Sequence, residues 1–124
     1  MAGPFGFQNV DLSTKPAATL VHIGFCKVNN VAMYNHGAQV SVLQIFDLGR
    51  VPVLGVDAPT WQFGCPFAST ADAATNQFTA EFHAGLKCIN GLAYALLTGF
   101  GTLSGGNLSN TGTMVGTIDW EIRP

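Results

Sequence analysis

Charged residues are what this sequence has least of. Lys and Arg number 5 and Asp and Glu number 7 among 124 residues, so charged residues are 10% of the chain and the net charge is -2. Soluble domains usually carry about a quarter of charged residues. The few cations are scattered and form no cluster that could neutralise phosphates, so we expect no nucleic-acid partner. The surface must be polar through uncharged side chains, or be partly covered by other subunits.

The sequence also lacks segments that would enter or cross a membrane. Its most apolar run, GLAYALLTGFG, has about half the length needed to span a bilayer. The first residues, MAGPFGFQ, lack the cationic segment and the apolar core of a secretory signal. We therefore expect a soluble protein that is made in a cytoplasm and has no membrane partner.

Catalytic motifs are missing as well. His22, His36 and His83 lie far apart, and no HExxH, GxSxG, P-loop or dinucleotide fingerprint is present. His83 and Cys88 are the one potential base and thiolate, but no third residue is placed to orient the histidine. His22 alternates with apolar neighbours and is interpreted as a core or interface histidine. We predict that the protein is not an enzyme and has no catalytic residue, cofactor or metal site.

Three cysteines, Cys26, Cys65 and Cys88, have no CxxC spacing and cannot all pair with one another. Each falls within or beside an apolar run, where a free cysteine behaves as a small hydrophobe. We predict three buried thiols, with one disulfide or a three-thiolate metal site as the alternatives.

Alternation with a period of two residues is present in several segments, whereas helical periodicity is almost absent. In TMVGTIDWEIRP, apolar side chains share one face and polar ones, including Asp119 and Glu121, share the other. Residues 60–65 and 77–83 alternate in the same way. These patterns predict half-buried antiparallel strands, with Trp61 and Trp120 in the core and Asp119 and Glu121 on a solvated face rather than in a catalytic pair.

Two further runs, TLVHIGFCKV (19–28) and VSVLQIF (40–46), are apolar on both faces. Their second face must be covered, and we expect a neighbouring subunit to cover it. Turn residues cluster at 34–38, 90–91 and 101–112, and a helical turn is expected only at 69–75. About eight short strands with connections of unequal length predict an all-β fold, an antiparallel β-sandwich with jelly-roll topology, over residues 16–124.

Residues 1–15 are predicted to form an extended N-terminal arm. Its glycines and proline leave Phe5 and Phe7 little to fold against within the arm itself. Aromatic anchors of this kind commonly dock into a partner, and we expect these two to do so.

The segment VPVLGVDAPTWQF (51–63) is predicted to be a rigid loop. Pro52 and Pro59 withhold backbone donors, so the segment cannot stay in a sheet. Gly55 permits a turn, and Asp57 has the position of a turn aspartate that accepts hydrogen bonds from local amides. Without a partner acid, histidine or metal set, Asp57 is interpreted as structural.

In their wider setting, VSVLQIFDLGRVPVLGVDAPTWQFGCP and FHAGLKCINGLAYALLTG resemble segments of a type of small tailed-phage virion protein. The resemblance covers roughly residues 28–122 and departs from the family pattern at 66–77. It implies a β-sandwich that serves as a non-enzymatic part of a phage particle. It carries over Asp57 and Pro59 as loop-forming residues and Gly91 as a turn residue, and no catalytic residue.

The resulting hypothesis is a capsid decoration (cement) protein on the virion surface, synthesised in the host cytoplasm. Its expected partners are the major capsid protein or another virion protein, and itself, as a dimer or trimer. The alternative is a tail, fibre or spike component with receptor or carbohydrate binding. We predict partner contacts at Phe5, Phe7, Arg50, Leu54, Phe67 and Leu103.

Overall fold

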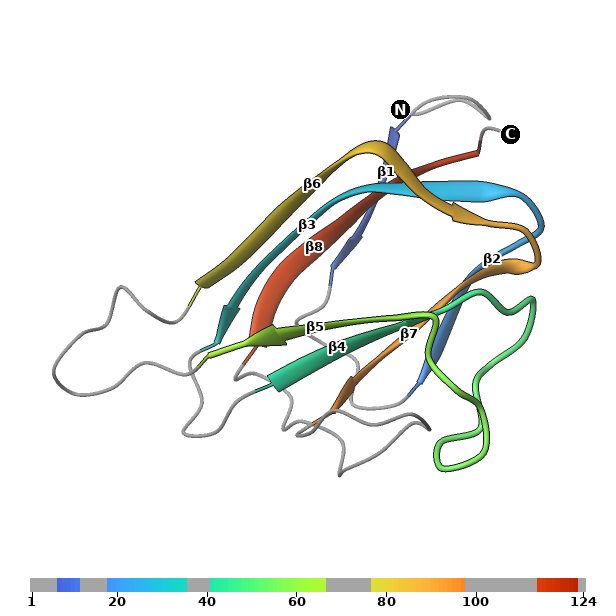
Figure 1. Cartoon of the computed structure of the whole chain (residues 1–124), viewed down its shortest axis with the longest axis horizontal. Helices are drawn as coiled ribbons and strands as arrows, with labels where there is room; N and C mark the ends of the chain where they lie inside the picture. Colours follow the sequence, from blue (N-terminus) through green and yellow to red (C-terminus); the bar gives the residue numbers. More distant parts are fainter. Residues whose placement is uncertain (1–6, 12–17, 36–40, 67–76, 98–113, 123–124) are drawn as a thin grey trace, which may run out of the picture.

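Eight strands form two antiparallel sheets that pack face to face (Figure 1). The computed structural model describes residues 7–11, 18–35, 41–66, 77–97 and 114–122, and all statements below concern these residues. The predicted all-β sandwich is confirmed. The strands are β1 (Phe7–Asp11), β2 (Thr19–Ile23), β3 (Cys26–Asn35), β4 (Ser41–Phe46), β5 (Trp61–Cys65), β6 (Gln77–Cys88), β7 (Gly91–Leu97) and β8 (Met114–Glu121).

The strand pairing is nested along the chain. β1 pairs with β8, β2 with β7, β3 with β6 and β4 with β5, and all these pairs are antiparallel. Two further pairs, β3 with β8 and β4 with β7, join them into one sheet of order β1-β8-β3-β6 and one of order β2-β7-β4-β5. Successive strands β2 and β3 therefore lie in different sheets, as do β6 and β7.

The main core fills the space between the sheets. Leu43, Ile45, Tyr94 and Ile118 are fully or almost fully buried there, and Trp120 is 6% exposed. Along the open side between β5 and β6, the ring of Phe63 lies 5.6 Å from that of Phe78 and 5.4 Å from that of Phe82, centroid to centroid. Trp61 also packs against this core, so both tryptophans face inward as predicted.

A second apolar cluster lies on the opposite face of the β2-β7-β4-β5 sheet. Phe46 packs there with Ala93, Ala95 and Leu97, and all four have no exposed surface. The partly buried side chains that pack against them are Ala18, Leu20, Leu48 and Leu54. The apolar second face of the described part of this run, Ser41–Phe46, is thus buried within a single chain. The expectation that a neighbouring subunit covers it was wrong, because period-two alternation says that a face is buried but not what buries it.

Glu121 corrects another expectation. It was predicted on a solvated face, yet its side chain is only 6% exposed and its Oε1 lies 3.3 Å from Nζ of Lys27. Lys27 and Glu121 face each other in the β3–β8 ladder, in the interior of the sheet. The aliphatic stem of Lys27 lies next to Gly85 of the neighbouring strand β6, and the pairing of the two charges makes the burial of the carboxylate tolerable.

The strand β1 lies within the predicted N-terminal arm. Residues Phe7–Asp11 pair with Thr117–Glu121 of β8 and form an edge of the sheet. This part of the arm therefore belongs to the sandwich. The segment FQNVD is short and has no clear alternation, so its pairing depends on the neighbouring strand rather than on a pattern of its own.

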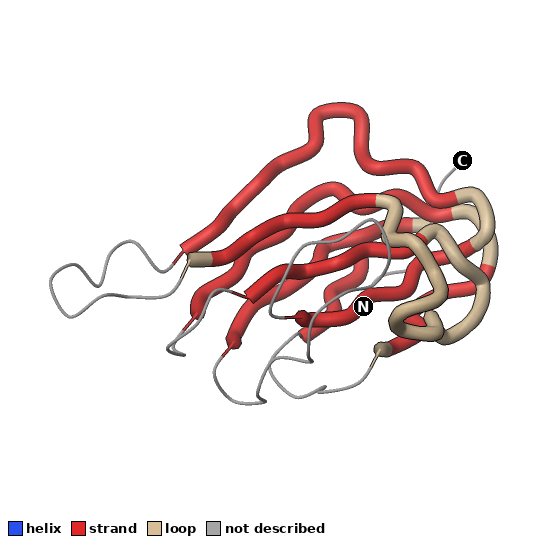
Figure 2. Tube along the Cα trace, turned by 60° about the horizontal axis from the view of Figure 1, so that its bottom comes forward, coloured by secondary structure: helices blue, strands red, loops and turns tan. Residues whose placement is uncertain are grey.

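β6 contains a large bulge of four residues opposite Asn29. Val28 faces Leu86 and Asn30 faces Glu81, so residues 82–85 of β6 lie opposite a single residue of β3. Gly85 has a φ of +78°, a conformation that favours glycine. Figure 2 shows β6 arching away from the sheet. Beyond the bulge, β3 and β6 continue for three residue pairs, from Val28 and Leu86 to Cys26 and Cys88.

Candidate functional site: an apolar end built from three connections

Six large apolar side chains are exposed together at one end of the sandwich. Each has between 50% and 67% of its surface exposed. One lies at the end of β2, and the others lie in the β2–β3 turn, the β4–β5 connection and the β6–β7 turn, which meet on the right in Figure 1. We call this surface the apolar end. Its residues are Ile23, Phe25, Val51, Val53, Val56 and Ile89.

The β2–β3 and β6–β7 turns are adjacent, and each carries the chain from one sheet to the other. The N–H of Gly24 donates a hydrogen bond of 2.8 Å to the carbonyl oxygen of Asn90. This bond holds Phe25 and Ile89 on neighbouring segments. Gly24 adopts a φ of +98°, which allows the chain to reverse in two residues between the sheets.

Asp47 ties the β4–β5 connection to the β6–β7 turn. Its Oδ1 accepts hydrogen bonds from the N–H groups of Asn90 (2.7 Å) and Gly91 (3.2 Å). Its own N–H donates to Oγ1 of Thr60 at 2.9 Å, and the Thr60 N–H donates to the carbonyl oxygen of Ile45 at 2.8 Å. The sequence pattern does not single out Asp47, since its acceptors and donors are more than ten residues away. The position of Asp47 directly after a buried strand is the feature of the sequence that could have indicated this role.

Within the β4–β5 connection, Arg50 and Asp57 form a two-pronged ion pair. Both terminal nitrogens of Arg50 donate to the carboxylate of Asp57, each at 2.7 Å. Asp57 Oδ2 also accepts from the N–H of Val53 at 2.6 Å, while the carbonyl oxygen of Val53 accepts from Val56 and Asp57. The loop is therefore held by its own polar groups, and Asp57 acts as the turn aspartate that the sequence suggested.

The remaining predicted loop residues support the same turn. Pro52 is buried, Pro59 is half-buried, and Gly55 has a φ of +82°. Gly91 fits where a side chain would not, because a Cβ there would lie 2.4 Å from the carbonyl oxygen of Leu48 and 2.5 Å from that of His22. Sterically restricted backbone thus holds the exposed valines and Ile89 in place.

We expect the ionisation of Asp57 to report on this ion pair. Hydrogen bonds from Arg50 and then from the Val53 amide lower the pKa of Asp57 to about 2, from an ordinary value of 3.8. Because the folded-state pKa is lowered, the interaction contributes stability above pH 4 and loses it as the pH falls toward 2. Carboxyl-carbon NMR titration should give a midpoint near 2, and Arg50→Gln should raise it toward 3.8. Lys87→Gln, which removes a distant cation, should leave it unchanged; an unchanged midpoint in Arg50→Gln would refute the assignment.

The predicted partner contacts are distributed unevenly over the structure. Arg50 is exposed beside the apolar end, with a side chain 55% exposed. Leu54 packs against the Phe46 cluster, and Phe7 lies in β1 at a sheet edge. Phe5, Phe67 and Leu103 lie outside the described residues, as does the helical turn expected at 69–75. Partner contact by any of them stays a prediction.

Ile23, Phe25 and Ile89 were not among the predicted contacts. The run 19–28 was interpreted as one strand with two buried faces, but it breaks at Gly24 and places its apolar residues beside a turn. The sequences Ile23-Gly24 and Ile89-Asn90-Gly91 could have indicated this exposure, because a large apolar residue next to a turn residue is seldom buried on both sides.

The titratable groups considered for catalysis do not assemble at this end. His22 is half-buried, and its ring packs against that of Trp120 in a tilted arrangement, with ring centroids 5.1 Å apart. His83 is exposed in the β6 bulge, whereas Cys88 is buried. Burial raises the pKa of Cys65 to about 11, so this thiol stays protonated at neutral pH.

Within the described ranges, no three His, Cys, Asp or Glu side chains lie close enough to hold a metal ion. This includes the three cysteines, all of which are buried and none of which is in a disulfide. No helix in the described part of the chain is long and apolar enough to cross a membrane.

The apolar end combines exposed apolar side chains with hydrogen-bonded connections. Apolar side chains project from three hydrogen-bonded connections, and the charges of Arg50 and Asp57 in the β4–β5 connection pair with each other. Removing such a surface from water lowers the free energy, and connections that are already ordered need little reorganisation to bind a partner. In comparisons with known proteins, no family model, curated protein or solved structure matches this chain.

Proposed function

We propose that this protein is a non-enzymatic structural protein of a tailed-phage particle, a capsid decoration protein that attaches to the assembled head through its apolar end. The observation that carries the proposal is the gathering of six exposed apolar side chains on one end of the sandwich. Apolar side chains that are exposed together on one end of a domain often mark a surface that contacts a partner. The expected partner is the major capsid protein or another virion protein with a complementary apolar surface.

The physical basis of this function is selective binding. A protein that binds only the assembled shell stabilises it by mass action, and icosahedral symmetry repeats each modest contact many times. The connections at the apolar end are already ordered by Asp47, Arg50 and Asp57. Little conformational entropy remains to be lost on binding.

The fold is compatible with this role but does not by itself imply it. The nested pairing of β1 with β8, β2 with β7, β3 with β6 and β4 with β5 supports describing the sandwich as a jelly roll, a fold found in viral capsid proteins. Self-association as a dimer or trimer, and docking of the N-terminal arm, are further parts of the proposal.

The test compares phage particles with and without this protein. Particles that lack it are expected to rupture at a lower temperature, measured by the release of DNA to a fluorescent dye. Adding back the wild-type protein should restore the threshold, and electron microscopy of restored particles should place the apolar end against the shell. Equal rupture temperatures with and without the protein would eliminate a cement function.

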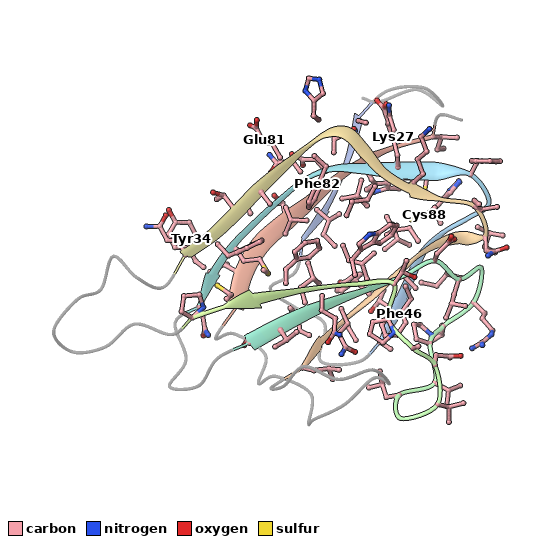
Figure 3. All side chains as sticks on the ribbon, viewed as in Figure 1. Lys27, Tyr34, Phe46, Glu81, Phe82 and Cys88 are labelled. Atoms are coloured by element: carbon pink, nitrogen blue, oxygen red, sulfur yellow. The ribbon has the colours of Figure 1, made fainter. Side chains whose placement is uncertain are left out.

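Two variants make this test specific. The double variant Phe25→Ser, Ile89→Ser removes one exposed aromatic ring and one exposed branched side chain from the apolar end. It is expected to weaken attachment to the shell at least tenfold. Val115→Ser is the matched control, because Val115 is also exposed but pairs with Tyr34 at the opposite end, where Figure 3 labels Tyr34. Equal attachment by both variants would remove the apolar end from the proposal. Electron-microscopy density for the protein at the tail, together with saturable binding of the isolated protein to a glycan array, would favour the receptor-binding alternative.

A further inference from the structure

We infer that Cys26 and Cys88 form a reversible dithiol–disulfide pair, a redox modification site that links the two turns of the apolar end. This inference does not depend on the proposed function. It concerns two of the three cysteines and leaves Cys65 outside the disulfide.

The two cysteines face each other directly across the β3–β6 ladder. Residues directly opposite in an antiparallel pair have Cα atoms about 4.5 or 5.5 Å apart, and disulfides bridge Cα separations of about 4.4–6.8 Å. Both side chains have no exposed surface, and the Cys88 thiol is hydrogen-bonded to the sulfur of Cys26. The strand register therefore already places the two cysteines opposite each other, and joining them requires no movement of one strand past the other.

Cys65 is in a different place. Its thiol lies 3.8 Å from the carbonyl oxygen of Met33. Met33 is seven residues along β3 from Cys26, roughly 20 Å at the rise of an extended strand. Of the pairings open to three cysteines, the fold brings together only Cys26 and Cys88.

The hydrogen bond also makes the two thiols chemically unequal. It lowers the pKa of Cys26 and raises the pKa of Cys88, because Cys88 donates to the developing Cys26 thiolate. The exchange can begin at Cys26. Its thiolate attacks one sulfur of a low-molecular-weight disulfide and expels one thiolate, leaving a mixed disulfide on Cys26. Cys88 then loses its proton, and its sulfur attacks the Cys26 sulfur and expels the second small thiol.

The balance of the reaction is two protein thiols oxidised and one small disulfide reduced to two thiols. Access requires local opening, since both sulfurs are buried. The pair lies at the end of the ladder, beyond the β6 bulge and next to two exposed turns. Short ladder ends of this kind open at lower cost than the middle of a sheet.

A bond between these sulfurs would join the segments that carry Phe25 and Ile89, each the immediate neighbour of one cysteine. In the unfolded chain, the bond would close a loop between residues 26 and 88. This lowers the conformational entropy of the unfolded state and so stabilises the fold. If the protein is a virion component, the thiols would stay reduced in the host cytoplasm and become oxidised after release. That last step alone depends on the proposed function.

The experiment uses the purified full-length protein. Reduced, urea-unfolded chain is refolded in glutathione buffers with a graded ratio of disulfide to thiol, which avoids any barrier to access in the folded state. The count of free thiols is expected to fall from three to one, and peptide mapping should find Cys26 joined to Cys88. Cys65→Ser should form the same bond, whereas Cys88→Ser should retain both remaining thiols.

Unfolding in urea provides the second readout. The midpoint should rise after oxidation in the wild type and in Cys65→Ser and stay unchanged in Cys88→Ser. Three free thiols at every glutathione ratio, a bond that includes Cys65, or a midpoint lowered by oxidation would each overturn the inference. None of these outcomes bears on capsid attachment, so failure here and failure of the proposed function are distinguishable.

Discussion

Replacing Phe46 by alanine is expected to lower the free energy of unfolding by about 3–5 kcal/mol, the usual cost of truncating a buried phenylalanine. Phe46 has no exposed surface and packs with Ala93, Ala95 and Leu97 outside the main core. The small alanines cannot move to refill the space, because they belong to the neighbouring strand β7 of the same sheet.

The measurement is urea unfolding at a dilution where light scattering shows a monomer, so that no neighbouring subunit contributes. Phe25→Ala is the matched control, since Phe25 is 50% exposed and its truncation should cost less than about 1 kcal/mol. If both variants lose the same small amount, the second cluster is not formed by the single chain, and a neighbouring subunit must cover it after all.

Replacing Gly91 by alanine is expected to cost about 3 kcal/mol, at the upper end of what overpacking usually costs. The new Cβ would lie 2.4 Å and 2.5 Å from the carbonyl oxygens of Leu48 and His22, which are backbone atoms and cannot rotate away. The β4–β5 connection and strand β2 would both have to shift. Because Gly91 begins β7 directly after the exposed turn, the geometry of the apolar end should change as well.

Gly55→Ala separates this steric effect from a conformational one. Gly55 has a φ of +82°, but a Cβ there would meet nothing within 4 Å. Its replacement should therefore cost only the left-handed conformation, about 1–2 kcal/mol. Thermal or urea unfolding of both variants compares them directly, and a Gly91→Ala protein as stable as Gly55→Ala would contradict the packing described around Gly91.

Strands with one wet face were predictable from sequence. In 77–83, exposed Gln77, Thr79 and Glu81 alternate with the half-buried Phe78 and Phe82, and the burial of β6 follows this order. The alternation was visible because β6 is an edge strand whose outer face meets water.

Strand β4, which is covered on both faces, was harder to interpret. All six residues of β4 are buried, so its sequence does not show which face packs against the other sheet and which packs in the Phe46 cluster. The burial of Glu121 was hidden for a related reason. Its counter-ion, Lys27, lies on another strand far away in the sequence, and only the β3–β8 register brings the two together.

By itself the sequence determined the fold class and the local structure of the 51–59 loop, because alternation, prolines and turn residues act over a few neighbouring positions. Only the tertiary structure decided which strands pair, what covers the second sheet face, and that three distant connections gather their apolar residues at one end. It alone also placed Cys26 opposite Cys88. These features depend on contacts between residues tens of positions apart, whose free energy exists only once the chain has folded.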